Sequence, residues 1–353
     1  MRSVPETGGD PRPGLYIHIP FCVRRCRYCA FYSTLCGTHD PGAYVRAVLA
    51  ELDPWAGPPP ATIYLGGGTP TALPRSALRA LVGGLNDRGL VTPEAEFTVE
   101  TNPGTLDGLT ADLLLAAGVN RLSIGCQSFD DATLRFLGRI HSGADGAVAV
   151  RLARAAGFPV ISLDLLRGVP GRTAADAHWD LERTLELVPD HISCYELAIE
   201  EGTPLDLDRA AGRLPALPDE AMLLALDAAV HGTLEAAGYR HYEVANFARP
   251  GRECRHNLLY WRGADHAAAG AGAVSLENGV RRRRVPDVAA YVARIAAGAD
   301  PADEREQVTG ATLARERFLM GLRLREGIDA DDFLRQTGTA LDVYLPRLRE
   351  LED

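Results

Sequence analysis

Three cysteines stand close together in the segment HIPFCVRRCRYCAFYS, where Cys22, Cys26 and Cys29 have the spacing C-x3-C-x2-C. Three thiolates on so short a loop can each bind one corner iron of a [4Fe–4S] cluster. No fourth cysteine follows at the spacing of a fully ligated cluster, which leaves one iron open to a substrate or cofactor. A low-potential cluster with an open iron can bind S-adenosylmethionine (SAM) and cleave it reductively. The loop therefore predicts a cluster that binds SAM.

Two other interpretations of the loop are a zinc site and three buried cysteines that bind nothing. Zinc sites usually combine paired C-x2-C units, or one such unit with two histidines, and the sequence has no such second half. Arg24, Arg25 and Arg27 lie between the cysteines, and positive charge favours the thiolate that binds iron. We therefore expect the cluster rather than zinc.

The elements that could position this loop follow from an alternation of strand-like and helix-like segments. A repeated strand-then-helix order is typical of βαβ units around a parallel sheet. The sequence thus predicts an α/β fold with a partial (β/α)6 barrel, because six units are too few for the full eight-fold barrel. The expected strands are 15–19, 62–66, 96–101, 121–126, 159–166 and 191–197, and the expected helices are 43–52, 75–86, 110–117, 145–156 and 174–187.

The rest of the chain predicts a smaller, mostly helical C-terminal domain. Asn278-Gly279 is a typical hairpin turn. The division that we expect is a disordered tail at 1–13, a barrel domain at 14–244 and a C-terminal domain at 245–353. Helices are expected at 219–237, 287–297, 310–324 and 330–336.

Polar and glycine residues collect at the carboxyl ends of the expected strands, which is where α/β sheets bind ligands. The glycines of LGGGTPT let a ligand approach the backbone closely, and carboxylates can accept hydrogen bonds from ribose or ammonium groups. Each residue alone is explained as a structural one, but together they predict a cofactor site facing the cysteine loop. They are Cys22, Gly66–Thr69, Glu100, Gln127, Asp164 and Glu196.

Composition narrows the class of protein. The 353 residues are 46% hydrophobic and 24% charged, which is usual for a soluble globular chain. The net charge of −10 argues against bulk nucleic-acid binding. The first residues lack the apolar core of a signal peptide, and no apolar run is long enough to span a membrane. We expect a cytoplasmic protein with reduced cysteines.

Several motifs resemble those of the radical SAM superfamily, namely HIPFCVRRCRYCAF, YLGGGTPT, VETNPGTL, RLSIGCQSF, LGRIHS and GVPGRT. More narrowly, they resemble its oxygen-independent coproporphyrinogen III oxidase-like branch, over residues 15 to 335 or so. The resemblance implies that Cys22, Cys26 and Cys29 hold the [4Fe–4S] cluster. It also implies SAM contacts from Tyr16, Tyr28, Gly67, Gly68, Thr69, Glu100, Gln127, Arg139, Asp164, Ala198 and Val274.

Two groups within this branch differ in their motifs. True coproporphyrinogen oxidases carry a further cysteine two residues after the third, and here that position is Phe31. The other group, of heme chaperones, carries H-N-x-x-Y-W, which matches His256, Asn257, Tyr260 and Trp261. Histidine is a good axial ligand of heme iron, and aromatic rings can cover a porphyrin face. Without the resemblance a packed core histidine is the preferred interpretation; with it, His256 is the expected heme ligand.

The function that the resemblance implies is a heme chaperone that binds the cluster, SAM and heme and delivers heme to hemoproteins. The alternative is an oxygen-independent coproporphyrinogen III oxidase (dehydrogenase), and radical chemistry on another substrate is a third, since fold alone does not determine function. The implied partners are hemoprotein acceptors, including membrane-associated respiratory enzymes, and a second copy of the chain. Coproporphyrinogen oxidase activity is not expected, and no catalytic residue is assigned. The sequence departs from the group at Val274, where a histidine is usual, and it ends at LRELED, before the usual final segment.

Overall fold

The computed structural model describes residues 12–349, so the tail expected at 1–13 lies almost wholly outside the described residues. Its centre is a run of six neighbouring strands, each parallel to the next. This confirms the predicted α/β fold with a partial six-stranded barrel. The six strands are β1 (Gly14–Ile19), β4 (Thr62–Gly67), β5 (Glu96–Thr101), β6 (Arg121–Gln127), β7 (Val160–Arg167) and β8 (His191–Glu196).

Helices connect these strands close to the expected positions, and their ends follow from capping residues. The side chain of Ser142 accepts from the Asp145 backbone N–H, while the side chain of Asp145 accepts from Ser142. This capping box starts α5, the longer of the two helices between β6 and β7. The same helix ends at Gly157, whose φ of +100° is a left-handed conformation that glycine adopts easily. The helices are α1 (Pro41–Glu51), α2 (Arg75–Asp87), α3 (Gly108–Ala116), α4 (Asp131–Leu137), α5 (Gly143–Ala156) and α6 (Ala174–Glu186), of which only α4 was not expected.

Further strands extend the central run at both edges. Next to β8 lie β10 (Asn246–Ala248) and β9 (Arg240–Glu243), both antiparallel to their neighbours. Next to β1 lies the parallel β11 (His266–Ala269). The boundary expected after residue 244 falls between the adjacent strands β9 and β10, and it stays a prediction.

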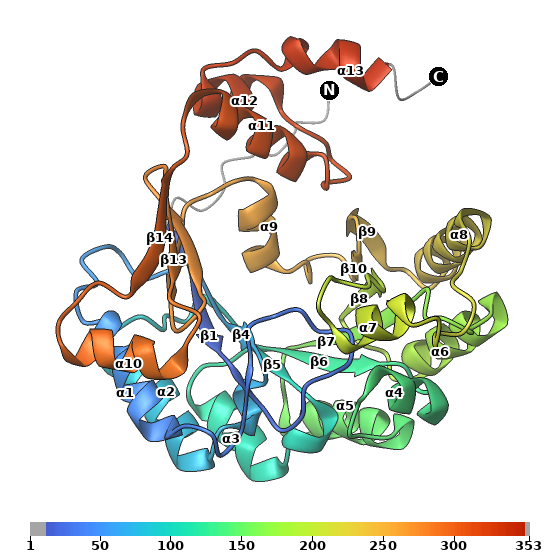
Figure 1. Ribbon diagram of the computed structural model, residues 1–353, viewed down its shortest axis with the longest axis horizontal. Coiled ribbons are helices and arrows are strands. Elements are labelled where there is room, and N and C mark those ends of the chain that lie inside the picture. Colours follow the sequence, from blue (N-terminus) through green and yellow to red (C-terminus); the bar gives the residue numbers. More distant parts are fainter. Residues whose placement is uncertain (1–11, 350–353) are drawn as a thin grey trace.

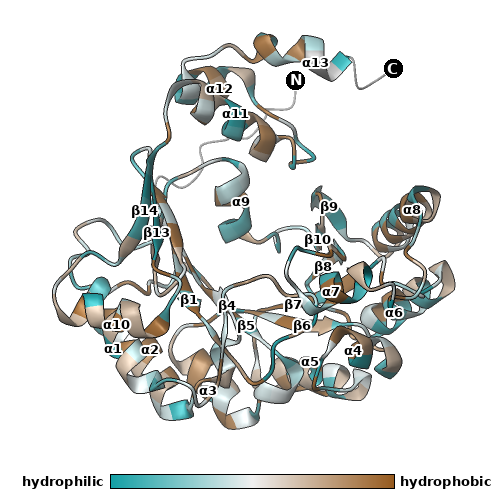
Figure 2. Cartoon of the chain, viewed as in Figure 1, coloured by the Kyte–Doolittle hydropathy of each residue, from teal (hydrophilic) through white to brown (hydrophobic). Residues whose placement is uncertain are grey.

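The hairpin expected at Asn278-Gly279 is confirmed. It joins β12 (Val274–Glu277) to β13 (Val280–Arg284), and both turn residues have positive φ, as a tight hairpin turn requires. With β14 (Ala302–Gln307), these strands complete a 12-stranded sheet in the order β14-β13-β12-β11-β1-β4-β5-β6-β7-β8-β10-β9. Arg281 and Arg283 of β13 form ion pairs with glutamates of β14. Both strands are mainly hydrophilic in Figure 2 because most of their residues are charged.

The remaining helices follow β8. They are α7 (Pro204–Ala210), α8 (Glu220–Ala236), α9 (Arg255–Trp261), α10 (Val288–Ala296), α11 (Gly310–Gly321), α12 (Ala330–Thr337) and α13 (Leu345–Arg349).

These helices differ in where they lie relative to the sheet. In Figure 1, α1 to α6 and α10 cover the outer face of the curved sheet, while α9 lies within its curve. The last helices form a separate layer with its own small core of Ala314, Phe318 and Phe333, so the C-terminal region is helical as expected.

Within the described residues, no helix has the length and apolar character needed to cross a membrane.

Candidate functional site

A cavity of about 460 Å³ opens at the carboxyl ends of the parallel strands, beside the cysteine loop. All three clustered cysteines line it, and all seven cysteines of the chain are free. Most of the SAM contacts implied by the resemblance line the same cavity. They are Tyr28, Gly67, Gly68, Thr69, Glu100, Gln127, Arg139, Asp164 and Ala198.

The cysteine loop is held at its ends and in its middle. The short strands β2 (Phe21–Cys22) and β3 (Thr34–Leu35) pair with each other and close the loop at its base. In the middle, the backbone of Arg27 donates to Leu137 O at 3.0 Å and accepts from Leu205 N at 3.0 Å. The loop is therefore fixed between α4 and α7, and its cysteines face the cavity.

Burial raises the pKa of the Cys22 thiol to about 11, and the neighbouring thiols of Cys29 and Cys26 add to this rise. Burial also raises the pKa of Cys29, although the charges of Arg25 and Arg139 oppose it. Thiols must lose their protons to bind iron, so positive charge beside these sulfurs favours a cluster.

The arginines that act on the sulfurs are Arg25 of the loop and Arg139, which comes from outside it. Arg27 points away from the cysteines, because Asp208 and the carbonyl of Phe136 hold its guanidinium. Arg139 instead donates from Nη1 to the sulfur of Cys26 at 3.3 Å. Arg139 therefore provides the side-chain contact with Cys26, and the effect expected of Arg24, Arg25 and Arg27 together stays a prediction.

Arg139 also leaves one donor without a partner. Its Nη2 donates to Asn102 Oδ1 and to the carbonyl of Gly125. Its buried Nε finds no hydrogen-bond partner among the described residues, and neither does the Thr98 hydroxyl on the cavity wall. Unpaired buried polar atoms are costly, so the cavity fits a ligand that supplies polar groups.

Two carboxylates, on the strands β5 and β7 that flank β6, face the cavity. Glu100 accepts from the Tyr64 hydroxyl at 2.8 Å and from Gly67 N at 3.0 Å. Asp164 accepts from the Ser123 hydroxyl at 3.0 Å. Burial is the main cause that raises the pKa of Glu100 to about 7 and that of Asp164 to about 6. Both groups can therefore accept hydrogen bonds as carboxylates above neutral pH.

The glycine-rich turn after β4 leaves no space for side chains. A Cβ at Gly67, where φ is +108°, would lie 2.4 Å from the ring of His18. At Gly68 it would lie 2.8 Å from the carbonyl oxygens of Ile19 and Phe21. Glycine at these positions lets the turn pack against the start of the cysteine loop while lining the cavity.

Two of the implied SAM contacts do not reach this cavity. The Tyr16 hydroxyl bonds with His18 Nδ1 at 3.0 Å, and Tyr16 is not among the residues that line the cavity. Val274 opens β12, which is separated from β1 by β11, and its side chain is 37% exposed.

Sequence reasoning missed several side chains of the cavity wall, although a signal was present. Side chains two residues apart on a strand share a face, so each residue two positions before an identified polar residue should also face the ligand. Thr98 precedes Glu100 in this way and Ser162 precedes Asp164, and both line the cavity. Tyr64, Ser123, Ser193 and Tyr195 line the same inner face.

His256 lies in the first turn of α9 and is 1% exposed. Its Nδ1 pairs with the Thr62 hydroxyl at 2.7 Å and its Nε2 with the Tyr260 hydroxyl at 2.9 Å. Burial lowers the pKa of the ring to about 3, so the imidazole is neutral at physiological pH. In this conformation both nitrogens are occupied, and an iron atom could bind Nε2 only after Tyr260 moves away.

Glu96 anchors the start of α9. Its carboxylate accepts from the backbone N–H groups of Arg255 and His256 at 3.2 and 3.0 Å, and it forms a buried ion pair with Arg121 at 3.1 Å. Asn257 of the same helix lines the cofactor cavity. The H-N-x-x-Y-W segment is therefore a fixed helix at the wall of this cavity.

Comparisons with known proteins give consistent results. The Radical SAM superfamily model matches residues 16–186, and the HemN C-terminal domain model matches residues 308–353. The chain is 36% identical to the protein named heme chaperone HemW of Escherichia coli, over 96% of this chain and 90% of the relative. It is 35% identical to the HemW of Bacillus subtilis, over 94% and 88%.

A solved structure supports the same fold. Coproporphyrinogen III oxidase (HemN) from Escherichia coli, described as a radical SAM enzyme, superimposes with a TM-score of 0.81. The match covers 96% of this chain and 82% of that one, at 24% sequence identity. At that identity the likeness concerns the fold alone.

Proposed function

The chain belongs to the HemW family of the radical SAM superfamily, and from that premise we propose that it is a heme chaperone. The superfamily implies a [4Fe–4S] cluster and SAM in the barrel. In this proposal the chain also binds heme and passes it to hemoproteins. The observation that carries it is helix α9, which holds a buried, neutral His256 next to Asn257, a residue of the cofactor cavity wall.

Cys22, Cys26 and Cys29 would hold the cluster in this proposal. When bound, the cluster supplies an open iron for the amino and carboxylate groups of SAM and an electron for its sulfonium. Arg139 would then donate to the cluster ligand Cys26 and place its positive charge at the wall of the SAM cavity. Glu100 and Asp164 would accept hydrogen bonds from the hydroxyl or ammonium groups of SAM.

Replacing Asp164 by asparagine should weaken SAM binding, because a charge-assisted hydrogen bond contributes about 1.5–3 kcal/mol. That corresponds to about a 10-fold to 150-fold loss of affinity. The measurement is calorimetric titration of the anaerobic, cluster-loaded protein with SAM. Asp112→Asn, at an exposed position on α3, is the control and should bind like the wild type.

The pH dependence of wild-type SAM binding follows from the same carboxylates. Because their pKa values are raised to about 6 and about 7, both are ionised at pH 8 and become protonated as the pH falls through 7 and 6. Affinity for the cationic cofactor should therefore fall over that range. A flat profile between pH 8 and 5.5, together with an unaffected Asp164→Asn variant, would remove Asp164 from the SAM site.

The state of His256 supports heme ligation. With the proton on Nδ1, the ring donates to the Thr62 hydroxyl and keeps the lone pair of Nε2, which accepts from Tyr260. A hydrogen bond at the second nitrogen is how metal-binding histidines are usually oriented. The low pKa of the ring keeps it in the neutral form that binds metals. Tyr260 would then act as a removable cover over the ligating nitrogen.

The alternative, a coproporphyrinogen oxidase, has less support. The position of the additional cysteine in those enzymes is Phe31, which is 69% exposed at the edge of the cavity. The cavity of about 460 Å³ lies in the lower half of the range for one drug-sized ligand, about 300–1,000 Å³. SAM alone would occupy much of it, and a four-carboxylate tetrapyrrole would need more space next to the cofactor.

One anaerobic experiment separates the two functions. The reconstituted protein is titrated with heme and, in parallel, incubated with SAM, reductant and coproporphyrinogen III. We expect saturable heme binding near one equivalent and no protoporphyrinogen. Turnover to protoporphyrinogen without heme binding would assign the enzyme function instead.

A further inference from the structure

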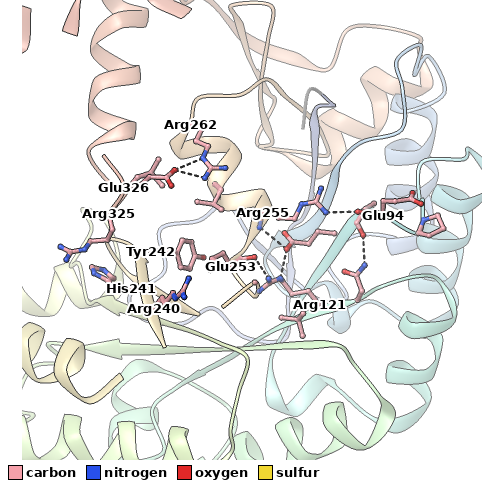
Figure 3. A pocket seen from close by; sticks show the side chains of 18 residues that line it. Glu94, Arg121, Arg240, His241, Tyr242, Glu253, Arg255, Arg262, Arg325 and Glu326 are labelled. Carbon is pink, nitrogen blue, oxygen red and sulfur yellow. Dashed lines mark hydrogen bonds and ion pairs between the residues drawn. The ribbon is translucent and has the colours of Figure 1, made fainter. Parts of the chain in front are cut away.

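A second cavity, of about 700 Å³, lies at the opposite ends of the strands from the cofactor site. Its walls are the starts of β5, β6 and β7, one face of α9, strand β9 and residues 324–326. Figure 3 shows this cavity with α9 along one side and the β9 residues at one end. Neither the motifs of the sequence nor the cofactor proposal uses it.

Two of the arginines that line this cavity have free guanidinium groups. Arg121 is paired with Glu96, and Arg262 is paired with Glu326 at 2.9 Å. The side chains of Arg240 and Arg325, in contrast, form no hydrogen bond or ion pair with any residue in the range 12–349, and both are exposed. The cavity therefore presents two arginines without an ion-pair partner among the described residues, in a lining that also contains Glu94, Glu96, Glu253 and Glu326.

The backbone keeps these two arginines near each other. Arg240 belongs to β9, and the backbone N–H of Arg325 donates to the carbonyl of Tyr242 in that strand at 3.1 Å. A β-bridge between Glu243 and Leu324 continues this pairing. Figure 3 accordingly shows Arg240 and Arg325 at the same end of the cavity, on either side of His241.

Apolar side chains line the cavity beyond these charges. Leu258 projects from α9, Leu324 from the segment beside β9, and Val160 from the start of β7. A ligand with an apolar body and two neighbouring acidic groups would suit these apolar side chains and the two unpaired arginines. Heme fits this description, because its two propionates lie side by side on one edge of a flat apolar ring.

We propose that this cavity is the docking site for heme, with Arg240 and Arg325 binding its two propionates. Planar guanidinium groups suit carboxylates because they donate two parallel hydrogen bonds. The volume lies within the range of small-molecule sites, about 300–1,000 Å³, and exceeds that of the cofactor cavity. The inference rests on the heme chaperone function proposed above and gives it an entry site.

Docking and iron ligation are separate steps in this arrangement. Arg255 and Leu258 of α9, and Arg262 just after it, line the cavity. His256, on another face of the helix, is covered by Tyr260. Porphyrin recognition by the arginines therefore does not need the iron, whereas ligation by His256 needs Tyr260 to move.

The test uses a porphyrin without iron. The anaerobically reconstituted full-length chain is titrated with metal-free protoporphyrin IX and, separately, with its dimethyl ester, which lacks the carboxylates. The variant is Arg240→Ala/Arg325→Ala. Its matched control is Arg79→Ala/Arg151→Ala, which removes two exposed arginines from α2 and α5. Circular dichroism checks that each variant is folded, and iron content checks that it holds the iron–sulfur cluster.

The wild type should bind the diacid at least 10-fold more tightly than the ester. The Arg240→Ala/Arg325→Ala variant should lose about 10-fold to 100-fold in affinity for the diacid, and the control variant should lose nothing. His256→Ala should bind metal-free porphyrin like the wild type. The advantage of the diacid should shrink as salt is raised, because the charges are near the surface.

Other outcomes overturn the inference in distinguishable ways. Equal binding of the diacid by the wild type and the arginine variant would exclude these arginines as the propionate site, even if heme binding depends on His256. Equal binding of the diacid and the ester by the wild type would exclude recognition of carboxylates. A wild type that binds no heme at all would remove both this inference and the chaperone function.

Discussion

Replacing any one of Cys22, Cys26 or Cys29 by alanine is expected to remove the iron–sulfur cluster from the protein. A cubane held by only three protein thiolates already has one open iron, and losing a further ligand leaves two corners unsupported. All three thiols line one cavity on a loop that is fixed at both ends and in the middle. The wild type, purified without oxygen, should hold about four irons, and each variant should hold almost none. Iron and sulfide analysis with visible absorption measures this.

The other four cysteines provide matched controls. Cys36 is exposed on the outer side of the loop, and its sulfur lies 3.8 Å from the carbonyl of Ala72. Cys126 and Cys194 are buried in β6 and β8, and Cys254, just before α9, is buried at the wall of the cofactor cavity. Alanine at each of these positions should leave the iron content unchanged. Our ligand assignment would fail if one of these four variants lost its cluster as completely as Cys26→Ala.

Much of the barrel could be predicted from the sequence because its signals are local. Each parallel strand is a short apolar run, such as the segment around Ile63 and Leu65, and most of the helices that follow begin at a capping side chain, although α2 begins after Pro74. The helix α4 was missed because it has only seven residues between a capping aspartate and Gly138. The pairing of β9 with residues 323–325 was also not predictable, since it joins segments about 80 residues apart through backbone atoms.

The cofactor cavity was also predictable in part, because some of its residues are identified by local sequence signals. Glu100 and Asp164 stand at the ends of strands, where the parallel sheet brings them together. The partners of Arg139 were not predictable, because its contacts with Cys26 and Asn102 cross more than 30 positions of the sequence. The burial of His256 also depends on tertiary contacts, since its partner Thr62 lies 194 positions away. Motifs identify residues, whereas their exposure and charge state follow from packing.

Replacing His256 by alanine is expected to remove the imidazole ligand of bound heme while leaving the cluster in place. The ring is neutral, and in the tautomer with the proton on Nδ1 it donates to Thr62 and keeps the lone pair of Nε2. Its loss should shift the Soret band and weaken heme binding, without changing the iron content of the cluster. Because the substitution leaves a ring-sized gap in the protein, added imidazole should restore both the spectrum and the affinity. Heme titration followed by absorption, with and without imidazole, is the measurement.

Tyr260→Phe is the matched partner of this variant and should act in the opposite direction. It keeps the aromatic ring beside His256 and removes the hydroxyl that occupies Nε2 in the free protein. One hydrogen bond contributes about 0.5–1.5 kcal/mol, so heme should bind about 2-fold to 10-fold more tightly. A purely structural role of the His-Tyr pair predicts that both variants lose affinity together, and that imidazole restores neither. Opposite changes in the two variants, with rescue of His256→Ala by imidazole, would instead identify His256 as the iron ligand and Tyr260 as the group that iron must displace.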